Sequence, residues 1–268
     1  MAHQAAETPL LPENVYGSQK RIRWIVRHLR PDDTIVDFGC GTGVMVTLPL
    51  ARLGYRVLGL DEHEPSLKYG RGRLRAEGLD ETILRQGRLS ELPARPDVII
   101  ASEVLEHLPK PVLSAVMDEM REHLKPGGKL LVTVPNGYGW FELESFLWYR
   151  ARLGRLLDWA FLTRIIPRLK KVLLRVPPEM HPSTLSPSPH VQRFTLASIC
   201  ALLEAHGFKV RAATGGVLVC GPFSNLAFTG LTPAMRLNAA LGARFSRAAA
   251  AFYVYATTPA SGEDDRGA

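Results

Sequence analysis

A short glycine-rich segment, residues 36–43 with the sequence VDFGCGTG, carries the groups best suited to hold a ligand. The glycines at 39, 41 and 43 would let the backbone turn sharply and approach a ligand that a Cβ atom would displace. A helix is expected to follow, and its free N–H groups would face acidic or polar ligand atoms. Asp61 comes 22 residues after Gly39, where its carboxylate could accept hydrogen bonds from two ribose hydroxyls. Together these features predict a site for a nucleoside-containing cofactor.

A second group of reactive side chains lies in residues 101–108, which read ASEVLEHL. If this segment begins a helix, Glu103, Glu106 and His107 share one face, because they stand at positions i, i+3 and i+4. Two carboxylates and an imidazole that converge in this way could ligate a divalent cation.

These residues need a scaffold, and the apolar pattern predicts one in which strands and helices alternate. The expected strands are 34–38, 56–61, 82–87, 97–102 and 129–134, and the expected helices are 18–29, 44–53, 66–78 and 111–124. Farther along, a helix over 195–208, a strand over 208–213, an apolar run over 215–223, a helix near 233–247 and a last strand over 251–258 are expected. This alternation predicts a parallel sheet that is covered on both faces.

The motifs in this scaffold resemble those of one family. VDFGCGTG closely resembles the first motif of the class I S-adenosylmethionine-dependent methyltransferases, LDEH their acidic second-strand end, and LKPGGKLLVTVPN their fifth-strand segment. A dinucleotide fingerprint would instead require glycine at position 44, where this chain has Val44. The resemblance covers residues 18–136 and resumes at HVQRFTLASICALLEAHGF. It implies an α/β fold with a Rossmann-like, doubly wound, seven-stranded and mostly parallel sheet in a single methyltransferase domain over 1–268.

The resemblance also implies which residues bind the cofactor. In the family the glycine loop lies under the methionine part, the acid like Asp61 binds the ribose, and the acid like Asp37 helps to organise the amino-acid end. Many members have an acid at the third strand where this chain has Arg88, with Glu91 three residues later, so no adenine-binding side chain is assigned. The expected S-adenosylmethionine contacts are Asp37, Phe38, Gly39, Cys40, Gly41, Gly43, Asp61, Glu62 and Ser102.

Methyl transfer depends mainly on alignment, but a hydroxyl acceptor must also lose its proton to a base or near a metal. The E-x-x-E-H string resembles both ubiquinone-biosynthesis O-methyltransferases and small-RNA 3′-end 2′-O-methyltransferases. In the RNA branch two acids, a histidine and a later histidine bind a metal, which implies the set Glu103, Glu106, His107 and His190. That branch has two adjacent histidines, whereas Leu108 follows His107 here. Without a metal, His107 and Glu106 are the candidate catalytic residues.

We therefore expect methyl transfer to an oxygen of a small or lipid-like acceptor. RNA 2′-O-methylation and a non-catalytic, cofactor-binding adaptor at a membrane surface are the alternatives.

Residues 138–189 interrupt the alternation and read as a helical insertion rich in aromatic and basic residues. Between Arg150 and Arg175 there are eight basic residues and one acid, so this window carries a net charge of +7, equal to that of the whole chain. Two short amphipathic helices over 146–176 could lie on an anionic membrane surface or form a lid over the acceptor pocket, or they could only pack on the core. Nucleic acid is a weaker candidate partner, because the aromatic side chains lie on the apolar faces.

The composition limits the remaining possibilities. With 46% hydrophobic and 22% charged residues among 268, wholesale disorder is excluded, although the tail 261–268 is expected to be disordered. Three scattered cysteines, a start without a secretory pattern and no uncharged apolar run of roughly 18 residues favour a cytoplasmic protein. The basic insertion adds a peripheral location at the inner face of a membrane, and the oligomeric state is not predicted.

Overall fold

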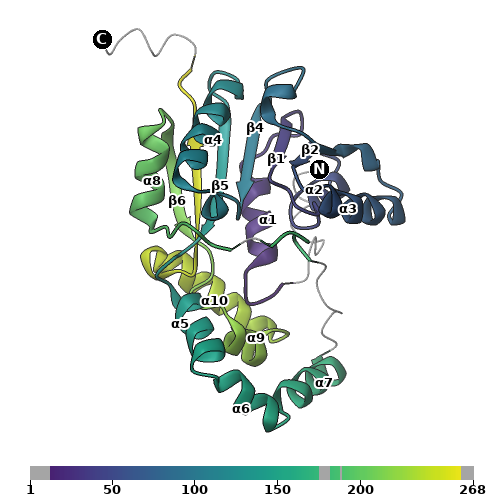
Figure 1. Ribbon diagram of the computed structural model, residues 1–268, viewed down its shortest axis with the longest axis vertical. Coiled ribbons are helices and arrows are strands. Elements are labelled where there is room, and N and C mark those ends of the chain that lie inside the picture. The colour runs from purple at the N-terminus through teal and green to yellow at the C-terminus, as the bar shows by residue number, and fades with distance from the viewer. Residues whose placement is uncertain (1–12, 175–181, 188, 261–268) are drawn as a thin grey trace.

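The computed structural model describes residues 13–174, 182–187 and 189–260 (Figure 1). Its centre is a seven-stranded sheet with the order β3-β2-β1-β4-β5-β7-β6. The pairs among β1 to β5 are parallel, whereas β7 runs antiparallel to both β5 and β6. The predicted fold class is confirmed, and the sheet is mixed because of β7. The strands are β1 (Thr34–Phe38), β2 (Arg56–Asp61), β3 (Leu84–Gln86), β4 (Val98–Ser102), β5 (Lys129–Pro135), β6 (Lys209–Gly215) and β7 (Ala251–Thr257).

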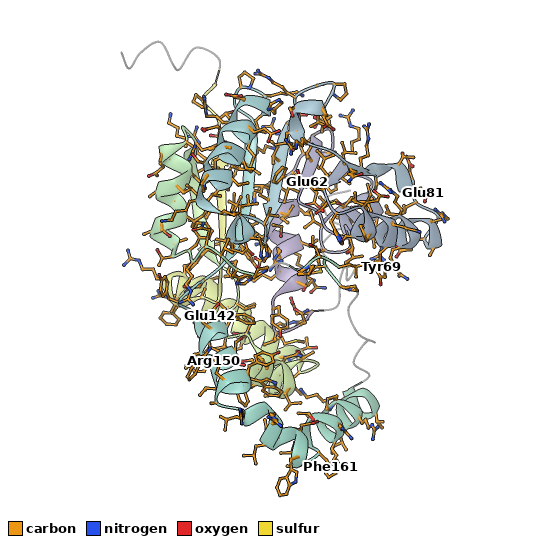
Figure 2. The ribbon with its side chains drawn as sticks, viewed as in Figure 1. Glu62, Tyr69, Glu81, Glu142, Arg150 and Phe161 are labelled. Carbon is orange, nitrogen blue, oxygen red and sulfur yellow. The ribbon has the colours of Figure 1, made fainter. Side chains whose placement is uncertain are left out.

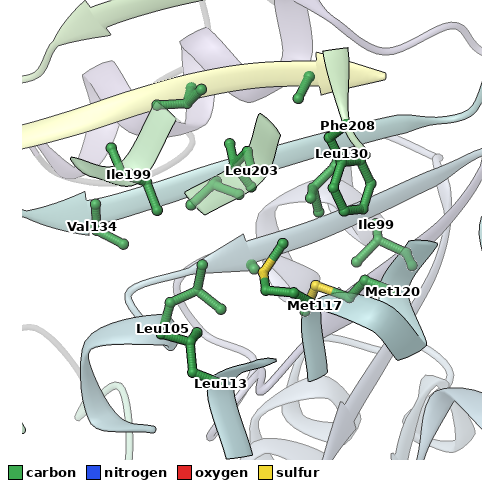
Figure 3. Packing of buried hydrophobic residues seen from close by; sticks show 14 of the residues in the cluster. Ile99, Leu105, Leu113, Met117, Met120, Leu130, Val134, Ile199, Leu203 and Phe208 are labelled. Atoms are coloured by element: carbon green, nitrogen blue, oxygen red, sulfur yellow. The ribbon is translucent and has the colours of Figure 1, made fainter. Parts of the chain in front are cut away.

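Helices cover both faces of this sheet, because the central strands carry apolar residues on both sides. Ile99 and Ile100 of β4 are both fully buried, yet they belong to different clusters. Ile99 packs with α4 (Lys110–His123) and α8 (Leu196–Ala205), as Figure 3 shows for Met117 and Leu203. Ile100 packs with α1 (Ser18–Arg27) and α2 (Thr47–Arg52) on the opposite face. A smaller cluster holds α3 (Glu64–Ala76) against Leu84 of β3.

The helix after the glycine-rich loop is shorter than the sequence predicts. The helix expected from residue 44 begins only at Thr47, because residues 44–46 complete the turn that leaves the glycine-rich loop. The apolar run 215–223 begins at the last residue of β6 and leads into α9 (Pro222–Phe228), which is followed by α10 (Thr232–Arg244). Pro222 at the first turn suits a helix start, since its missing N–H would be unpaired there.

The expected helical insertion leaves the sheet after β5 and extends away from it at the lower end of Figure 1. Its described part contains α5 (Trp140–Ser145), a π-helical turn η5 (Phe146–Arg150), α6 (Leu153–Trp159) and α7 (Leu162–Leu174). Buried Glu144 joins its base to α9 by accepting a hydrogen bond from the Ser224 amide at 2.8 Å. Residues 182–187 and 189 of the expected insertion form no helix, whereas 175–181, 188 and the tail 261–268 lie outside the described residues. Within the described ranges, no helix is both long and apolar enough to cross a membrane.

Four short 3₁₀ turns complete the described chain. They are η2 (Glu81–Ile83), η3 (Leu89–Glu91), η4 (Leu105–His107) and η6 (Ser246–Ala248).

Candidate functional site

The glycine-rich loop and Asp61 meet at the carboxyl edge of the sheet, because β1 and β2 are parallel neighbours. Gly39 and Gly41 have φ angles of 65° and 57°, a region that L-residues with side chains rarely adopt. The Asp61 carboxylate accepts hydrogen bonds from the Gly41 amide at 2.7 Å and the His63 amide at 2.8 Å. Asp61 is half-buried, and a carboxylate has further lone pairs, so it can still accept ribose hydroxyls.

Asp37 lies beneath this loop and ties it to α2. Its carboxylate accepts hydrogen bonds from the Thr47 hydroxyl at 2.6 Å and from the Thr47 amide at 3.1 Å. Burial raises the pKa of Asp37 to about 7. The hydrogen bonds from Thr47 act in the opposite direction but have a smaller effect. Asp37 thus fixes the start of the helix whose N-terminus follows the glycine-rich loop.

The other expected cofactor residues contribute in different ways. The Cys40 thiol lies 2.9 Å from where a Cβ on Gly59 would stand, so it faces the sheet, and burial raises its pKa well above the usual range. The Glu62 side chain, which Figure 2 labels, is exposed and forms an ion pair with Arg88 at 3.3 Å. The Ser102 hydroxyl stands 3.0 Å from that of Thr133 at the end of β4. The partly buried Phe38 packs against the core.

The segment 103–107 is not the α-helix on which the shared-face argument depended. Glu103 has a φ of 58°, and only residues 105–107 form a turn, the 3₁₀ helix η4. The Glu103 amide donates to the Thr133 carbonyl oxygen at 2.8 Å, which keeps this residue at the end of β4. Its carboxylate lies 3.3 Å from the Arg21 guanidinium and accepts from the Thr133 hydroxyl at 3.2 Å. The expected placement of Glu103 on one face with Glu106 and His107 is therefore wrong.

Glu106, His107 and His190 form a cluster in which one ligand atom from each lies within 4.8 Å of the others. Of the four expected metal ligands, Glu103 stands outside this group. The Glu106 carbonyl oxygen accepts from the amides of Val191 and Gln192 at 2.8 and 2.9 Å, and this pairing brings His190 to the turn. The two imidazole ring centres are 5.0 Å apart.

The Glu106 side chain is only 1% exposed, and neither of its oxygens has a hydrogen-bond partner among the described residues. Burial, reinforced by the nearby Glu103 carboxylate, raises the pKa of Glu106 well above its usual range. Buried carboxyl oxygens without partners are rare in native proteins and point to a function or to a bound group.

His107 is held in one tautomer by its neighbours. Its Nδ1 lies 3.1 Å from the Pro189 carbonyl oxygen, which can only accept, so Nδ1 carries the proton. Nε2 therefore offers a lone pair, and it lies 3.8 Å from a Glu106 oxygen. Burial, with a contribution from His107, lowers the pKa of His190 and favours its neutral form.

These donors fit a divalent cation. The unpartnered Glu106 oxygens, Nε2 of His107 and a neutral His190 are ligand types that zinc, manganese and related metals accept. The same arrangement also fits a general base without a metal.

Two features of the site were missed by the sequence interpretation. Arg21 of α1 is buried and reaches Glu103, although its position in the helix pattern looks like part of a solvent face. Residues 182–187 lie against the glycine-rich loop, although a Pro/Ser-rich composition is typical of a solvent-exposed connection.

A groove of about 560 Å³ at the opposite end of β1 and β2, lined by Thr34, Tyr55 and Arg95 among others, contains none of the expected site residues.

The mixed sheet, the glycine-rich loop after β1 and Asp61 at the end of β2 define the class as a Rossmann-like, S-adenosylmethionine-dependent methyltransferase. A family profile described as a methyltransferase domain matches residues 16–213, well over half of the chain. The protein belongs to this methyltransferase domain family.

Curated relatives match over part of the chain. A ubiquinone biosynthesis O-methyltransferase of Stutzerimonas stutzeri is 31% identical over 120 residues, which cover 43% of this chain and 50% of the relative. The same enzyme of Aeromonas salmonicida is 24% identical over 184 residues, which cover 68% and 65%. A ribosomal protein L11 methyltransferase of Thermus thermophilus is 29% identical over 139 residues, which cover 48% and 52%. The chain spans about half the length of most of these relatives.

Solved structures share the fold at low identity. A Methanosarcina mazei S-adenosylmethionine-dependent methyltransferase superposes with a TM-score of 0.54 at 20% identity, over 88% of this chain and 97% of the other. The glycopeptide N-methyltransferase MtfA complexed with S-adenosylmethionine gives 0.53 at 17% identity, over 94% and 91%.

Proposed function

We propose that the protein transfers the methyl group of S-adenosylmethionine to an oxygen of a small or lipid-like acceptor, with His107 as the general base. The observation that carries this proposal is the pairing of His107, whose Nε2 is left with a lone pair, with the buried and unpartnered Glu106. The similarity to ubiquinone biosynthesis O-methyltransferases supports a small-molecule acceptor with a hydroxyl group.

In this mechanism the bound cofactor supplies an electrophilic methyl group. Asp61 holds the ribose, and the glycine-rich loop lets the cofactor approach the backbone. Nε2 of His107 takes the proton of the acceptor hydroxyl, while the Pro189 carbonyl keeps the ring oriented through Nδ1. The Glu106 carboxyl lies 3.8 Å from the same nitrogen, and in its ionised form it would stabilise the imidazolium that results.

A divalent cation held by Glu106, His107 and His190 is the other way to acidify a hydroxyl, and it would take the place of the base. The two versions differ in their response to a chelator. Activity that survives dialysis against EDTA supports His107 as the base, whereas activity that returns only with added Mg²⁺, Mn²⁺ or Zn²⁺ supports the metal version.

The test compares His107→Ala with His206→Ala, a control in which the lost imidazole contacts Asp118 on the surface. Loss of a general base typically costs about 100- to 10,000-fold in rate. We expect this loss in kcat for His107→Ala, which should still bind S-adenosylhomocysteine in calorimetry, and no change for the control. Full activity of His107→Ala would refute the assignment.

The arm formed by α6 and α7, residues 153–174, is the part of the protein that we propose to bind an anionic membrane surface. Eight of its large apolar side chains are exposed rather than packed on the core, Trp159 and Val172 both to 79%. Figure 2 shows Phe161 at the tip of the arm, pointing away from the sheet. The exposed apolar residues are Leu153, Leu156, Trp159, Phe161, Leu162, Ile165, Leu169 and Val172.

Positive charge accompanies this apolar surface. Arg155, Arg164 and Arg168 are exposed on the arm, and Asp158 is paired with Arg164 at 3.8 Å. Lys170 instead faces α9, where its Nζ contacts the carbonyl oxygens of residues 226, 227 and 229. The arm is thus attached to α9 through Lys170, while its apolar side chains and arginines stay available to acyl chains and lipid phosphates. A membrane-bound arm would give a lipid-like acceptor a short path to the site.

Vesicle sedimentation tests this part of the proposal. We expect binding to vesicles with about one third phosphatidylglycerol and none to pure phosphatidylcholine, and weaker binding at high salt. Trp159→Ser combined with Phe161→Ser should reduce binding at least about tenfold, since each buried aromatic side chain contributes about 1.5–3 kcal/mol. Leu237→Ser, which removes a 60% exposed leucine from α10, is the matched control and should change nothing. Binding to single-stranded RNA but not to vesicles would contradict the proposal and favour an RNA acceptor.

A further inference from the structure

Residues 182–187 lie directly on the glycine-rich loop. The Thr42 amide donates to the Ser183 carbonyl oxygen at 2.8 Å, and the Thr42 hydroxyl donates to the Pro182 carbonyl oxygen at 2.7 Å. A Cβ on Gly41 would stand 2.2 Å from the Ser183 oxygen, so only glycine allows this approach. The backbone of this segment is therefore in direct contact with the loop.

The same segment is attached to the start of α3 through Ser66, which is fully buried. The Leu185 amide donates to the Ser66 hydroxyl oxygen at 2.9 Å. That oxygen also lies 2.8 Å from Nδ1 of His63, whose amide donates to the Asp61 carboxylate. Since the segment's contacts go to Thr42 and Ser66 while Asp61 stays half-exposed beside them, the segment borders the ribose position rather than filling it.

A few residues later the chain reaches the acceptor side of the site. The Pro189 carbonyl accepts from Nδ1 of His107, and the amides of Val191 and Gln192 donate to the Glu106 carbonyl oxygen. We call residues 182–187 and 189–192 together the strap. Figure 1 shows this part of the chain crossing the view between α3 and α8.

We infer that the strap couples cofactor binding to the geometry of the acceptor site, with Thr42 and Ser66 as positioning residues. The inference rests on the proposed function. A cofactor on the glycine-rich loop would contact residues 182–185. When these residues stay bound to the loop, they would also keep Pro189 and His190 in their positions beside His107. Neighbouring chain segments that contact both halves of a site are a physical route for such coupling.

Hydrogen exchange with S-adenosylhomocysteine tests the coupling without turnover. In the unaltered protein, the ligand should slow exchange of the Val191 and Gln192 amides at least about threefold, although they pair with Glu106 and not with the loop. Thr42→Val combined with Ser66→Ala removes two strap contacts and should abolish this slowing and weaken ligand affinity about three- to tenfold. Thr42→Ser keeps the hydroxyl that donates to the Pro182 carbonyl oxygen, so this variant should keep the part of the ligand affinity that depends on that hydrogen bond.

Gln192→Ala supplies a reciprocal test from the acceptor side, because it removes the contact of Nε2 with the Leu108 carbonyl at 3.0 Å. Gln192 is not in contact with the glycine-rich loop. If the two sites are coupled, linkage nevertheless requires that this variant weaken the affinity for S-adenosylhomocysteine. The coupling would be overturned if the ligand slowed exchange of the Val191 and Gln192 amides equally in the double variant and the unaltered protein. It would also be overturned if the ligand slowed exchange in neither protein or made it faster. These outcomes would leave the methyltransferase proposal intact. Absence of ligand binding by the folded, unaltered protein would instead refute the proposed function.

Discussion

Replacing Glu106 by glutamine should stabilise the protein and impair catalysis at the same time. The side chain is 1% exposed and both oxygens lack partners, so the ionised carboxylate has lost its hydration without compensation. An unsatisfied buried acceptor costs about 1–3 kcal/mol, and a charged one costs more. Glu106→Gln keeps the shape of the side chain and removes the charge.

The effect should depend on pH with a definite sign. Because the folded-state pKa of Glu106 is raised by burial, the folded protein binds more protons than the unfolded chain above the usual glutamate pKa. The free energy of unfolding therefore falls as pH rises through this window. Glutamine does not titrate, so the advantage of Glu106→Gln should be small near about pH 5 and reach about 1–3 kcal/mol near about pH 8.

Urea denaturation at both pH values, with EDTA present, measures this difference. Glu144→Gln is the matched control, because Glu144 is also buried but accepts hydrogen bonds from the Ser224 amide and the Trp140 indole. That variant should be destabilised by about 1–3 kcal/mol. If Glu106→Gln were destabilised as much as Glu144→Gln near about pH 8, the reasoning about an unpartnered carboxyl would be refuted.

The remaining predictions concern the cofactor loop and the arm. Asp61→Ala should weaken binding of S-adenosylhomocysteine about 100-fold in calorimetry, because two charge-assisted hydrogen bonds to the ribose are lost, and unchanged affinity would remove Asp61 from this role. Asp37→Asn should flatten the fall in unfolding free energy between about pH 4 and about pH 7, where the raised pKa of Asp37 lets the folded state hold an extra proton worth up to about 4 kcal/mol. An unchanged pH slope in denaturation would contradict that assignment. Lys170→Met should make the arm more sensitive to trypsin while leaving cofactor affinity unchanged, because its Nζ caps the carbonyl oxygens that end α9. Equal digestion rates would show that this contact does not hold the arm.

The parts of the site that depend on local sequence were predictable. The glycine spacing and Asp61 belong to a strand–turn–helix unit and the strand beside it, so the sequence indicates both the turn and the acid that faces it. The apolar runs of β1, β2, β4 and β5 likewise indicate a sheet buried on both faces.

The parts that depend on distant contacts were not predictable. Helical spacing placed Glu103 with Glu106, but the hydrogen bond from the Glu103 amide to Thr133 of β5 accompanies a backbone conformation that no helix contains. Arg21 lies at the site because α1 packs beside β4, and the strap lies there because Thr42 and Ser66 bind its backbone. Neither the packing of α1 nor the docking of the strap has a local signal.

The insertion has some features that the sequence predicts and others that depend on distant contacts. Its charge and its apolar positions were evident from the sequence, and its described part up to residue 174 is mainly helical, whereas residues 182–187 are not. That its apolar side chains stay exposed depends on how Lys170 and Glu144 attach it to α9, and this attachment is a tertiary property. The exposure makes an interaction surface a stronger interpretation than internal packing.

Transfer of a radiolabelled methyl group from S-adenosylmethionine to a fractionated cell extract tests the central claim most directly. The account predicts label in the organic-soluble fraction with the unaltered protein, and loss of that label with His107→Ala, a variant that still binds S-adenosylhomocysteine. Label that appears in RNA or protein, or an organic-soluble signal that survives in His107→Ala, would contradict it.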